Sequence, residues 1–247
     1  NHRVQKFTIA GAFVGAIGNT TATTGTCPAA AVAPAWCTGG TFGMGAGDGA
    51  FMTPGMVAYD SANNQLYVAD RSNNRIQVRH AGTGAFIGNL GAHPVATAGW
   101  KSSTTTVAPG SSNYSCAADN CLSWPNGFAL DDANGFIYVV DSGNHRIQKF
   151  NQSTGAAIGS IGRTSATTGT CPAAAAASGW CTGGTFLAGA GDGMFSNPVT
   201  AAFDAINGFL FVADYGNNRI VKVNASPGAF VGAIGVVNGS TGTCPVG

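Results

Sequence analysis

The carboxylate side chains of this chain all belong to ten aspartates, because its 247 residues include no glutamate. A pair of carboxylates can act as acid and base in glycoside hydrolysis. Nine of the ten aspartates, however, fall at three positions that recur along the chain, and only Asp132 stands outside this pattern. Aspartates at strand ends accept backbone hydrogen bonds and pair with nearby arginines. We therefore predict structural pairs of Asp70 with Arg75, Asp141 with Arg146, and Asp214 with Arg219.

The four histidines do not form an evident ligand set. His2 and His145 occupy the same repeat position, whereas His80 and His93 are single residues. Zinc needs several His or Cys ligands, and one carboxylate per Gly-Asp-Gly turn is too few for Ca²⁺. No serine lies in a Gly-x-Ser-x-Gly sequence, and no glycine-rich string joins a strand to a helix. The sequence thus predicts no catalytic residue, no metal and no cofactor.

Seven cysteines carry the strongest chemical signal. Two pairs have a ten-residue spacing in nearly identical sequence, and a third pair is closer together. Zinc knuckles need a CxxC spacing, which is missing here. Local pairs of this kind predict disulfides and hence an oxidising, secreted environment. The predicted disulfides join Cys27 to Cys37, Cys116 to Cys121 and Cys171 to Cys181, and we expect the partner of Cys244 outside the chain.

A segment that recurs three times, about 72 residues apart, predicts the elements that position these residues. Each copy holds four short runs rich in β-branched and aromatic residues, separated by Asn, Asp and Gly turn signals. Asn-Gly at 134–135 and 207–208 adds a strong hairpin signal. Each copy is therefore predicted to form a four-stranded antiparallel sheet. Such sheets must stack on one another to bury both faces.

The amino-acid motifs of the repeat resemble those of the NHL repeat. The first copy reads Gly47-Asp-Gly-Ala-Phe-Met-Thr-Pro54, then Leu66-Tyr-Val-Ala-Asp70, then Asn73-Asn-Arg-Ile-Gln77. Asn144-His145-Arg146 and Asn1-His2-Arg3 nearly spell the triplet that names the repeat. The resemblance covers about two thirds of the chain. It implies an all-β fold of β-propeller blades, about three and a half in this chain, with long disulfide-closed inserts between blades.

The repeat divides the chain into alternating blades and inserts, all within one propeller or array. The first segment matches only the third and fourth strands of a blade, so we expect the propeller to be incomplete. Either the chain is a piece of a longer one, or exposed half blades pair with a neighbour in an open array. The predicted segments are a half blade at 1–18, blades at 47–91, 119–162 and 191–235, inserts at 19–46, 92–118 and 163–190, and the start of a further insert at 236–247.

Charge is sparse, with 9% charged residues and a formal net charge of +1. Capture of nucleic acid or of an anionic membrane needs clustered Lys and Arg, so neither partner is expected. No apolar run approaches the roughly 20 residues of a membrane span, so no membrane insertion is expected. Together with the cysteines, this composition predicts a secreted or extracellular-surface protein.

Five sequons are candidate N-glycosylation sites, which would make this a glycoprotein. Two of them occupy the same position after the third strand of their copies. The candidate asparagines are Asn19, Asn113, Asn151, Asn224 and Asn238.

Trp36 and Trp180 each precede the second cysteine of an insert. Such a ring either packs on the disulfide or stacks on a sugar or protein partner, and its solvent exposure discriminates between the two.

These observations predict a structural or adhesive module and not an enzyme. Its partners would be other copies, as a homo-oligomer or polymer, or matrix proteins and glycans. A second hypothesis is a discrete secreted propeller that binds a peptide or glycan on the face that carries the inserts. A third is part of a propeller enzyme whose catalytic blades lie elsewhere. The resemblance extends to amidating lyases, which hold zinc with histidines from several blades, but the first and third copies offer no matching histidines.

Overall fold

In the computed structural model, the chain is built almost entirely from β-strands. The structure describes residues 1–22, 25–28, 31–91, 99–100, 118–166, 169–172 and 175–235. These residues form sixteen strands and three single-turn 3-10 helices. None of the helices in these ranges has the length and apolar character needed to cross a membrane.

The first complete blade shows how the repeat sequence produces a sheet. Between its second and third strands the chain makes the single-turn helix η1 (Arg71–Asn73) and enters the left-handed region at Asn74, with φ of 54°. Asparagine tolerates this region better than most residues, so the Asn-Asn dipeptide of the repeat permits the reversal. The four strands pair in order as an antiparallel meander: β4 (Pro54–Asp60), β5 (Gln65–Asp70), β6 (Arg75–His80) and β7 (Phe86–Leu90).

The other sheets repeat this plan with additions from the inserts. The second blade contains β8 (Pro125–Asp131), β9 (Phe136–Asp141), η2 (Ser142–Asn144), β10 (Arg146–Asn151), β11 (Ala157–Ala166) and, as a fifth strand, β12 (Thr185–Leu187). The third blade contains β13 (Thr200–Asp204), β14 (Phe209–Asp214), η3 (Tyr215–Asn217), β15 (Arg219–Asn224) and β16 (Phe230–Gly235). The half blade contains β1 (Arg3–Phe7) and β2 (Phe13–Ala22), with β3 (Thr41–Gly43) added to β2.

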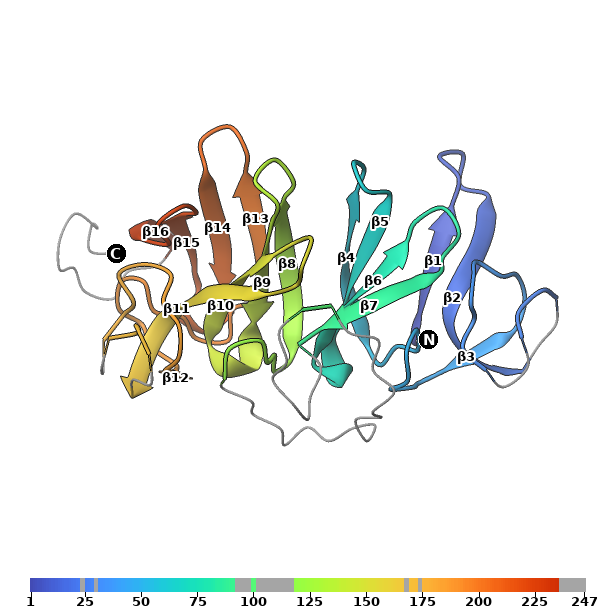
Figure 1. The fold of residues 1–247 in the computed structure, drawn as a ribbon, viewed down its shortest axis with the longest axis horizontal. Coiled ribbons are helices and arrows are strands. Elements are labelled where there is room, and N and C mark those ends of the chain that lie inside the picture. The colour runs from blue at the N-terminus through green and yellow to red at the C-terminus, as the bar shows by residue number, and fades with distance from the viewer. Residues whose placement is uncertain are drawn as a thin grey trace.

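The four sheets stand side by side in chain order, as the blades of a propeller do (Figure 1). The first strands of the complete blades are neighbours, because β8 contacts β4 on one side and β13 on the other. The half blade packs on the first blade through a cluster that joins Val4 and Ile17 to Phe51 and Val68. The predicted all-β fold of propeller blades is confirmed.

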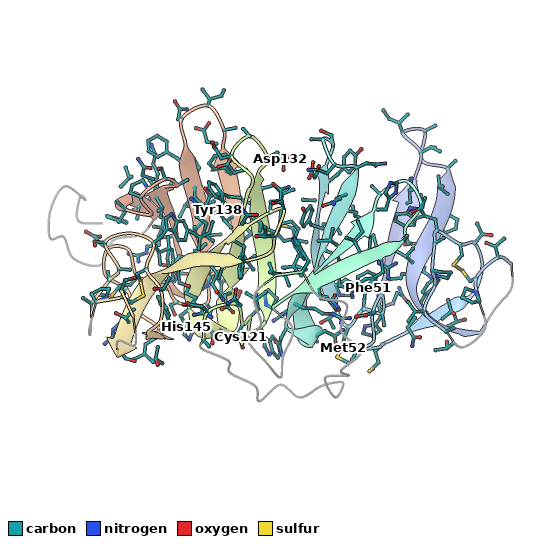
Figure 2. All side chains as sticks on the ribbon, in the orientation of Figure 1. Phe51, Met52, Cys121, Asp132, Tyr138 and His145 are labelled. Atoms are coloured by element: carbon teal, nitrogen blue, oxygen red, sulfur yellow. A yellow bond between two sulfur atoms is a disulfide. The ribbon has the colours of Figure 1, made fainter. Side chains whose placement is uncertain are left out.

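Neighbouring complete blades bury an apolar layer between their sheets. Tyr67 of β5 lies against Phe128 of β8, with ring centroids 6.3 Å apart. Tyr138 of β9 lies against Phe203 of β13 in the same way, at 5.7 Å (Figure 2). Burial of a side chain of this size contributes about 2–3 kcal/mol. The aromatic residue of the second strand therefore does much to hold each blade to the next.

The loops between second and third strands lie at the same end of the sheets as the chain segments that lead into each blade. In Figure 2, His145 and Cys121 lie at this end and Asp132 at the opposite end. Asn73 donates from Nδ2 to the carbonyl of Gly45 at 2.8 Å, which ties η1 to the end of the preceding insert.

The first insert does not stay at this end of the sheets. Strand β2 continues past the predicted half-blade limit at residue 18 to Ala22. The insert then folds back along β2, where Cys37 bridges Ala16 and Val32 bridges Asn19. The outermost strand thereby gains backbone partners, which protects an edge that would otherwise be open to aggregation.

Candidate interaction site at the half blade

The predicted aspartate–arginine pairs are present in all three complete blades. In the first, Oδ2 of the buried Asp70 accepts hydrogen bonds from Arg75 Nε at 2.8 Å, Asn73 Nδ2 at 2.8 Å and Gln77 Nε2 at 2.9 Å. Its other oxygen accepts the backbone N–H of Met52 at 2.7 Å. This carboxylate therefore fixes the end of the second strand to the third strand and to the segment that leads into the blade.

The other two complete blades repeat this arrangement. Asp141 and Arg146 are joined at 2.8 Å, and Asp214 and Arg219 at 2.9 Å. Both aspartates are fully buried. Carboxylates used in this way are structural anchors and are not free for acid–base chemistry.

The half blade holds the arginine of this pair without the aspartate. The guanidinium carbon of Arg3 lies 5.4 Å from the ring centroid of Phe42, just as that of Arg146 lies 5.2 Å from Phe186. Arg3 Nε is buried and has no hydrogen-bond partner among the described residues. A buried N–H without an acceptor is costly, so this atom marks a place where an acceptor is missing.

A lysine on the third strand shows the same difference. In the second blade the buried Lys149 places Nζ 3.7 Å from the ring centroid of Phe136, with Tyr138 at 5.5 Å and Trp180 at 5.6 Å. Burial lowers the pKa of Lys149, although the charge of Asp131 opposes this shift. The three rings around the ammonium group form an aromatic clamp of the cation–π type.

Lys6 of the half blade has only one ring of this clamp. Its Nζ lies 5.5 Å from the ring centroid of Trp36 and donates to the carbonyl of Ala81 at 3.2 Å. The rings that correspond to Phe136 and Tyr138 belong to a second strand, and no described strand occupies that place beside β1. The ammonium group of Lys6 and one face of Trp36 thus border the position of a second strand.

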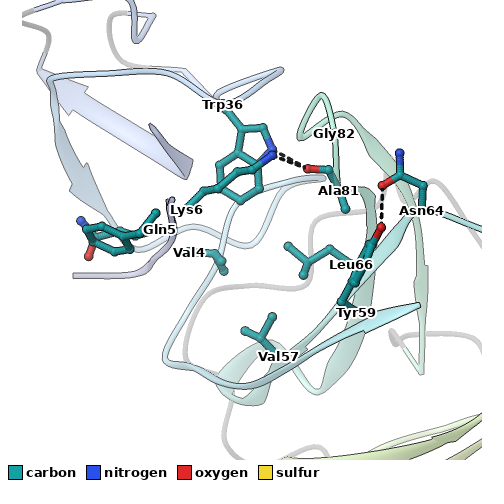
Figure 3. A pocket seen from close by; sticks show the side chains of 11 residues that line it. Val4, Gln5, Lys6, Trp36, Val57, Tyr59, Asn64, Leu66, Ala81 and Gly82 are labelled. Carbon is teal, nitrogen blue, oxygen red and sulfur yellow. Dashed lines mark hydrogen bonds between the residues drawn. The ribbon is translucent and has the colours of Figure 1, made fainter. Parts of the chain in front are cut away.

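A cavity of about 470 Å³ lies at this position (Figure 3). Its walls are β1 with Lys6, the insert with Trp36, and the first blade with Val57, Tyr59 and Leu66. Tyr59 is 55% exposed, and its hydroxyl donates to Asn64 Oδ1 at 3.3 Å. The cavity thus combines apolar walls with one ammonium group, as binding sites for aromatic side chains do.

The two tryptophans singled out in the sequence are half-buried and connect blades. Trp180 stacks on Tyr138 with 5.6 Å between ring centroids, and its Nε1 donates to Ala225 of the third blade at 2.9 Å. Trp36 makes the equivalent bond to Ala81 at 2.9 Å without an equivalent of Tyr138. Trp100 packs on Tyr67 in a similar way, with 5.8 Å between ring centroids. The sequence did not single out this tryptophan, because no cysteine follows it.

The two ten-residue cysteine pairs, Cys27–Cys37 and Cys171–Cys181, are disulfides in the structure. Cys121 is also disulfide-bonded, whereas its predicted partner Cys116 lies outside the described residues, as does Cys244. These bonds close the inserts on which Trp36 and Trp180 stand.

The described sequon asparagines lie on strand β2 and at the last residues of β10 and β15. Asn19 donates from Nδ2 to the carbonyl of Met44 at 3.2 Å. Asn151 accepts the backbone N–H of Thr154 at 2.9 Å, and Asn224 accepts that of Ser226 at 3.1 Å. Asn113 and Asn238 lie outside the described residues. Glycosylation at these positions stays a prediction.

Metal ligands do not gather in the described part of the chain. Within those ranges, no three His, Cys, Asp or Glu side chains lie close enough together to hold an ion. His145 instead accepts the backbone N–H of Asn197 at its Nδ1, at 3.0 Å, and so joins the second blade to the third.

Comparison with known proteins agrees with this architecture. The family model of the NHL repeat matches residues 51–78 and 122–150. The chain therefore contains NHL repeats, as its sequence predicts, and the third blade repeats the same elements in the structure. NHL repeats suggest a protein-interaction module. No curated protein matches the sequence.

Three solved structures are similar to the chain at low identity. One is a chain of a nidogen–laminin complex, which is 13% identical over 75% of this chain and 48% of that chain, with a TM-score of 0.42. The second is hydrazine synthase of Kuenenia stuttgartiensis, which is 12% identical over 74% of this chain and 36% of that chain, with a TM-score of 0.45. The third is Sqt1 of Saccharomyces cerevisiae, which is 11% identical over 73% of this chain and 35% of that chain, with a TM-score of 0.43. The chain thus spans less than half of each of these proteins.

Proposed function

We propose that this protein is an extracellular structural or assembly module, which acts by contact with other polypeptide chains and not by catalysis. The observation that carries this proposal is the number of large hydrophobic side chains that the described blades leave exposed. Such side chains are exposed on the half blade and on each complete blade, and contiguous groups of them mark interaction surfaces. On the half blade these are Phe7, Phe13 and Val14, and on the third blade Ile220, Val231 and Ile234.

Three further features support the proposal. The disulfide-closed inserts fit an oxidising, extracellular environment. The low charge of the chain favours apolar contacts over electrostatic capture of nucleic acid. The repeat aspartates Asp70, Asp141 and Asp214 are all used in structural ion pairs, which leaves them unsuited to acid–base chemistry.

Electron microscopy of the native, non-reduced protein tests this function. We expect regular filaments or arrays with a repeat of blade size, and isolated closed rings would overturn the proposal. Replacement of Ile234, which is 73% exposed on the third blade, by Asp should abolish the assembly. The control is Ile206→Asp, because Ile206 is also highly exposed but lies in the turn between β13 and β14. This control variant should assemble normally.

A further inference from the structure

Each of the first two complete blades contains a buried polar site between its third and fourth strands. In the second blade, Gln148 of β10 is paired across the sheet with Ser160 of β11, and both side chains are fully buried. The side chains of such a pair lie close together on one face of the sheet. Among the described residues, Gln148 Oε1 and Ser160 Oγ have no hydrogen-bond partner. An unpartnered buried polar atom is costly, so this pair indicates a ligand.

The orientation of the glutamine amide is fixed by its nitrogen. Gln148 Nε2 donates to Asp141 Oδ2 at 3.0 Å and also to the carbonyl of Cys121. Both partners are acceptors and would repel an oxygen, so the amide cannot be reversed. Gln77 of the first blade is held in the same way by Asp70, at 2.9 Å. In both blades Oε1 is therefore the atom that still needs a donor.

A further atom without a partner in the described ranges is Asp119 Oδ1, on the segment that leads into the second blade. The other oxygen of Asp119 accepts the backbone N–H of Gly183 at 2.8 Å. Gly183 lies two residues after Cys181, and Cys181 forms a backbone bridge with Ser160. The carboxylate of Asp119 therefore reaches the segment that lies beside the fourth strand.

The first blade shows directly that a carboxylate at this position reaches the fourth strand. Asp48, at the repeat position of Asp119, accepts from Asn89 Nδ2 at 2.9 Å. Asn89 occupies the position of Ser160, whose side chain is shorter. Ser160 does not make the equivalent bond to Asp119. A small molecule that bridges the two side chains can make it instead.

The first blade has its own set of three such atoms among the described residues. Gln77 Oε1 and Asn89 Oδ1, which belong to the equivalent cross-strand pair, are buried acceptors without a donor. Arg79 Nε is a buried donor without an acceptor, and it lies two residues along β6, on the same face as Gln77. This site thus offers one donor and two acceptors. The second blade offers the same set, with a hydroxyl as the donor and a carboxylate and an amide oxygen as the acceptors.

We propose that each of these two sites binds one water molecule as a fixed part of the blade, and that this water accepts one hydrogen bond and donates two. A buried water in a protein makes about three hydrogen bonds to polar groups that would otherwise be unsatisfied. In the second blade the water links the entry segment at Asp119 to the third and fourth strands. These waters bind whether or not the protein assembles, so they do not depend on the proposed function.

The third blade is the internal control for this proposal. Its equivalent cross-strand pair is Val221 and Ala233, whose side chains have no polar atoms. The position of Arg79 is occupied by Val223. An apolar site of this kind stays dry. The polar residues of the first two blades thus occur as sets, and where the cross-strand pair is apolar no bridging water is expected.

A metal ion fits these sites less well than water does. In the first blade the donor is the guanidinium group of Arg79, and its positive charge repels a cation. In the second blade the three side-chain oxygens include one carboxylate, whereas Ca²⁺ takes roughly six to eight oxygen ligands. Removal of metal ions with EDTA should therefore leave the Tm unchanged, and a fall in the Tm would overturn the proposal.

The direct test is a high-resolution crystal structure of the 247-residue protein. We expect one ordered water at each site, within about 2.5–3.2 Å of its three polar atoms. These atoms are Asp119 Oδ1, Gln148 Oε1 and Ser160 Oγ in the second blade, and Gln77 Oε1, Asn89 Oδ1 and Arg79 Nε in the first. Two outcomes overturn the proposal: sites without ordered solvent, or protein groups that satisfy these atoms. Contacts of about 2.3–2.6 Å would identify Ca²⁺ and would also overturn it.

A solution measurement tests the site in the second blade. Relaxation dispersion of water ¹⁷O reports the number of waters that stay buried in a protein. The double variant Gln148→Val with Ser160→Ala copies the apolar pair of the third blade, and it should contain one long-lived water fewer than the unchanged protein. The control is Ser165→Ala, because Ser165 is an exposed serine on the same strand and its loss should leave the number unchanged. An equal number of waters in the double variant and the unchanged protein would contradict the proposal.

Discussion

The half blade and the second blade are built from nearly the same third and fourth strands, yet their side chains have different environments. Phe150 of β10 is fully buried, whereas Phe7 at the same position of β1 is 53% exposed. Gln148 is buried against Asp141, and its equivalent Gln5 is exposed. The residues are alike, so the difference comes from the neighbours that a blade provides.

This comparison separates two roles of one sequence motif. Inside a complete blade, the Arg and Lys of the third strand satisfy buried groups and contribute to stability. On the half blade Lys6 lines a cavity, and no described strand pairs with the other edge of β1. The same repeat motif is thus buried within a complete blade and partly exposed in the half blade.

The largest expected difference concerns the arginines. Arg146→Ala should destabilise the protein by about 3–5 kcal/mol, because it leaves the buried Asp141 without its partner. Arg3→Ala should change the free energy of unfolding by no more than about 0.5 kcal/mol, because it removes a donor whose Nε already lacks an acceptor. Chemical denaturation of both variants measures the difference. Equal losses would show that Arg3 has a structural partner and would contradict the comparison.

Removal of a disulfide should have the next largest effect on stability. Cys27–Cys37 and Cys171–Cys181 close loops of the same length, so paired Cys→Ala variants should each lose about 2–3 kcal/mol in the chain-entropy model. The first bond belongs to the half blade's insert and the second to the insert between complete blades. A smaller loss for Cys27–Cys37, measured by urea unfolding, would show that the half blade unfolds separately from the rest.

The lysines of the two third strands, Lys149 and Lys6, should also differ in their contribution to stability, by a smaller amount than the arginines. Lys149→Ala should cost about 1–2 kcal/mol, because the buried ammonium group contacts three aromatic rings. Lys6→Ala should cost less than about 1 kcal/mol, because its ammonium group contacts one aromatic ring, Trp36, where that of Lys149 contacts three. Thermal unfolding of both variants checks the order. Lys149→Met retains the apolar stem and should recover part of the loss, which separates packing from charge.

The repeat made the fold predictable, because its period and its turn residues determine the strands before any contact is known. The Asp–Arg pairs and the two ten-residue disulfides followed from position alone. The site at the half blade was not predicted, although the alignment of Lys6 with Lys149 is a signal in the sequence. The alignment alone does not show which residues surround the lysine, because this depends on the pairing register between the second and third strands. The pairing of the first insert with β2 was also not predicted. It depends on backbone bridges at Ala16 and Asn19, and no pattern of side chains in the sequence indicates them.

The smallest expected effect is a dependence on pH at the joints between blades. Each joint uses the residue that precedes the repeat arginine as an acceptor for a backbone N–H of the next blade. His2 accepts from Thr53 at 3.1 Å and His145 from Asn197 at 3.0 Å, both at Nδ1, whereas Asn74 accepts from Trp124 at Oδ1, at 2.8 Å. The His145 joint can lose its acceptor by protonation, whereas the Asn74 joint cannot.

The sign of the effect follows from the environment of His145. Burial lowers its pKa below the ordinary value of a histidine, and the charges of Asp141 and Asp214 oppose this shift only in part. The folded state therefore binds this proton less readily than the unfolded state, so stability is complete at neutral pH and falls as the pH drops below about 6.5. His145→Asn, which copies the joint at Asn74, should remove this part of the pH dependence between pH 7 and pH 5 in thermal unfolding. An unchanged pH profile in His145→Asn would show that the joint between the second and third blades does not titrate.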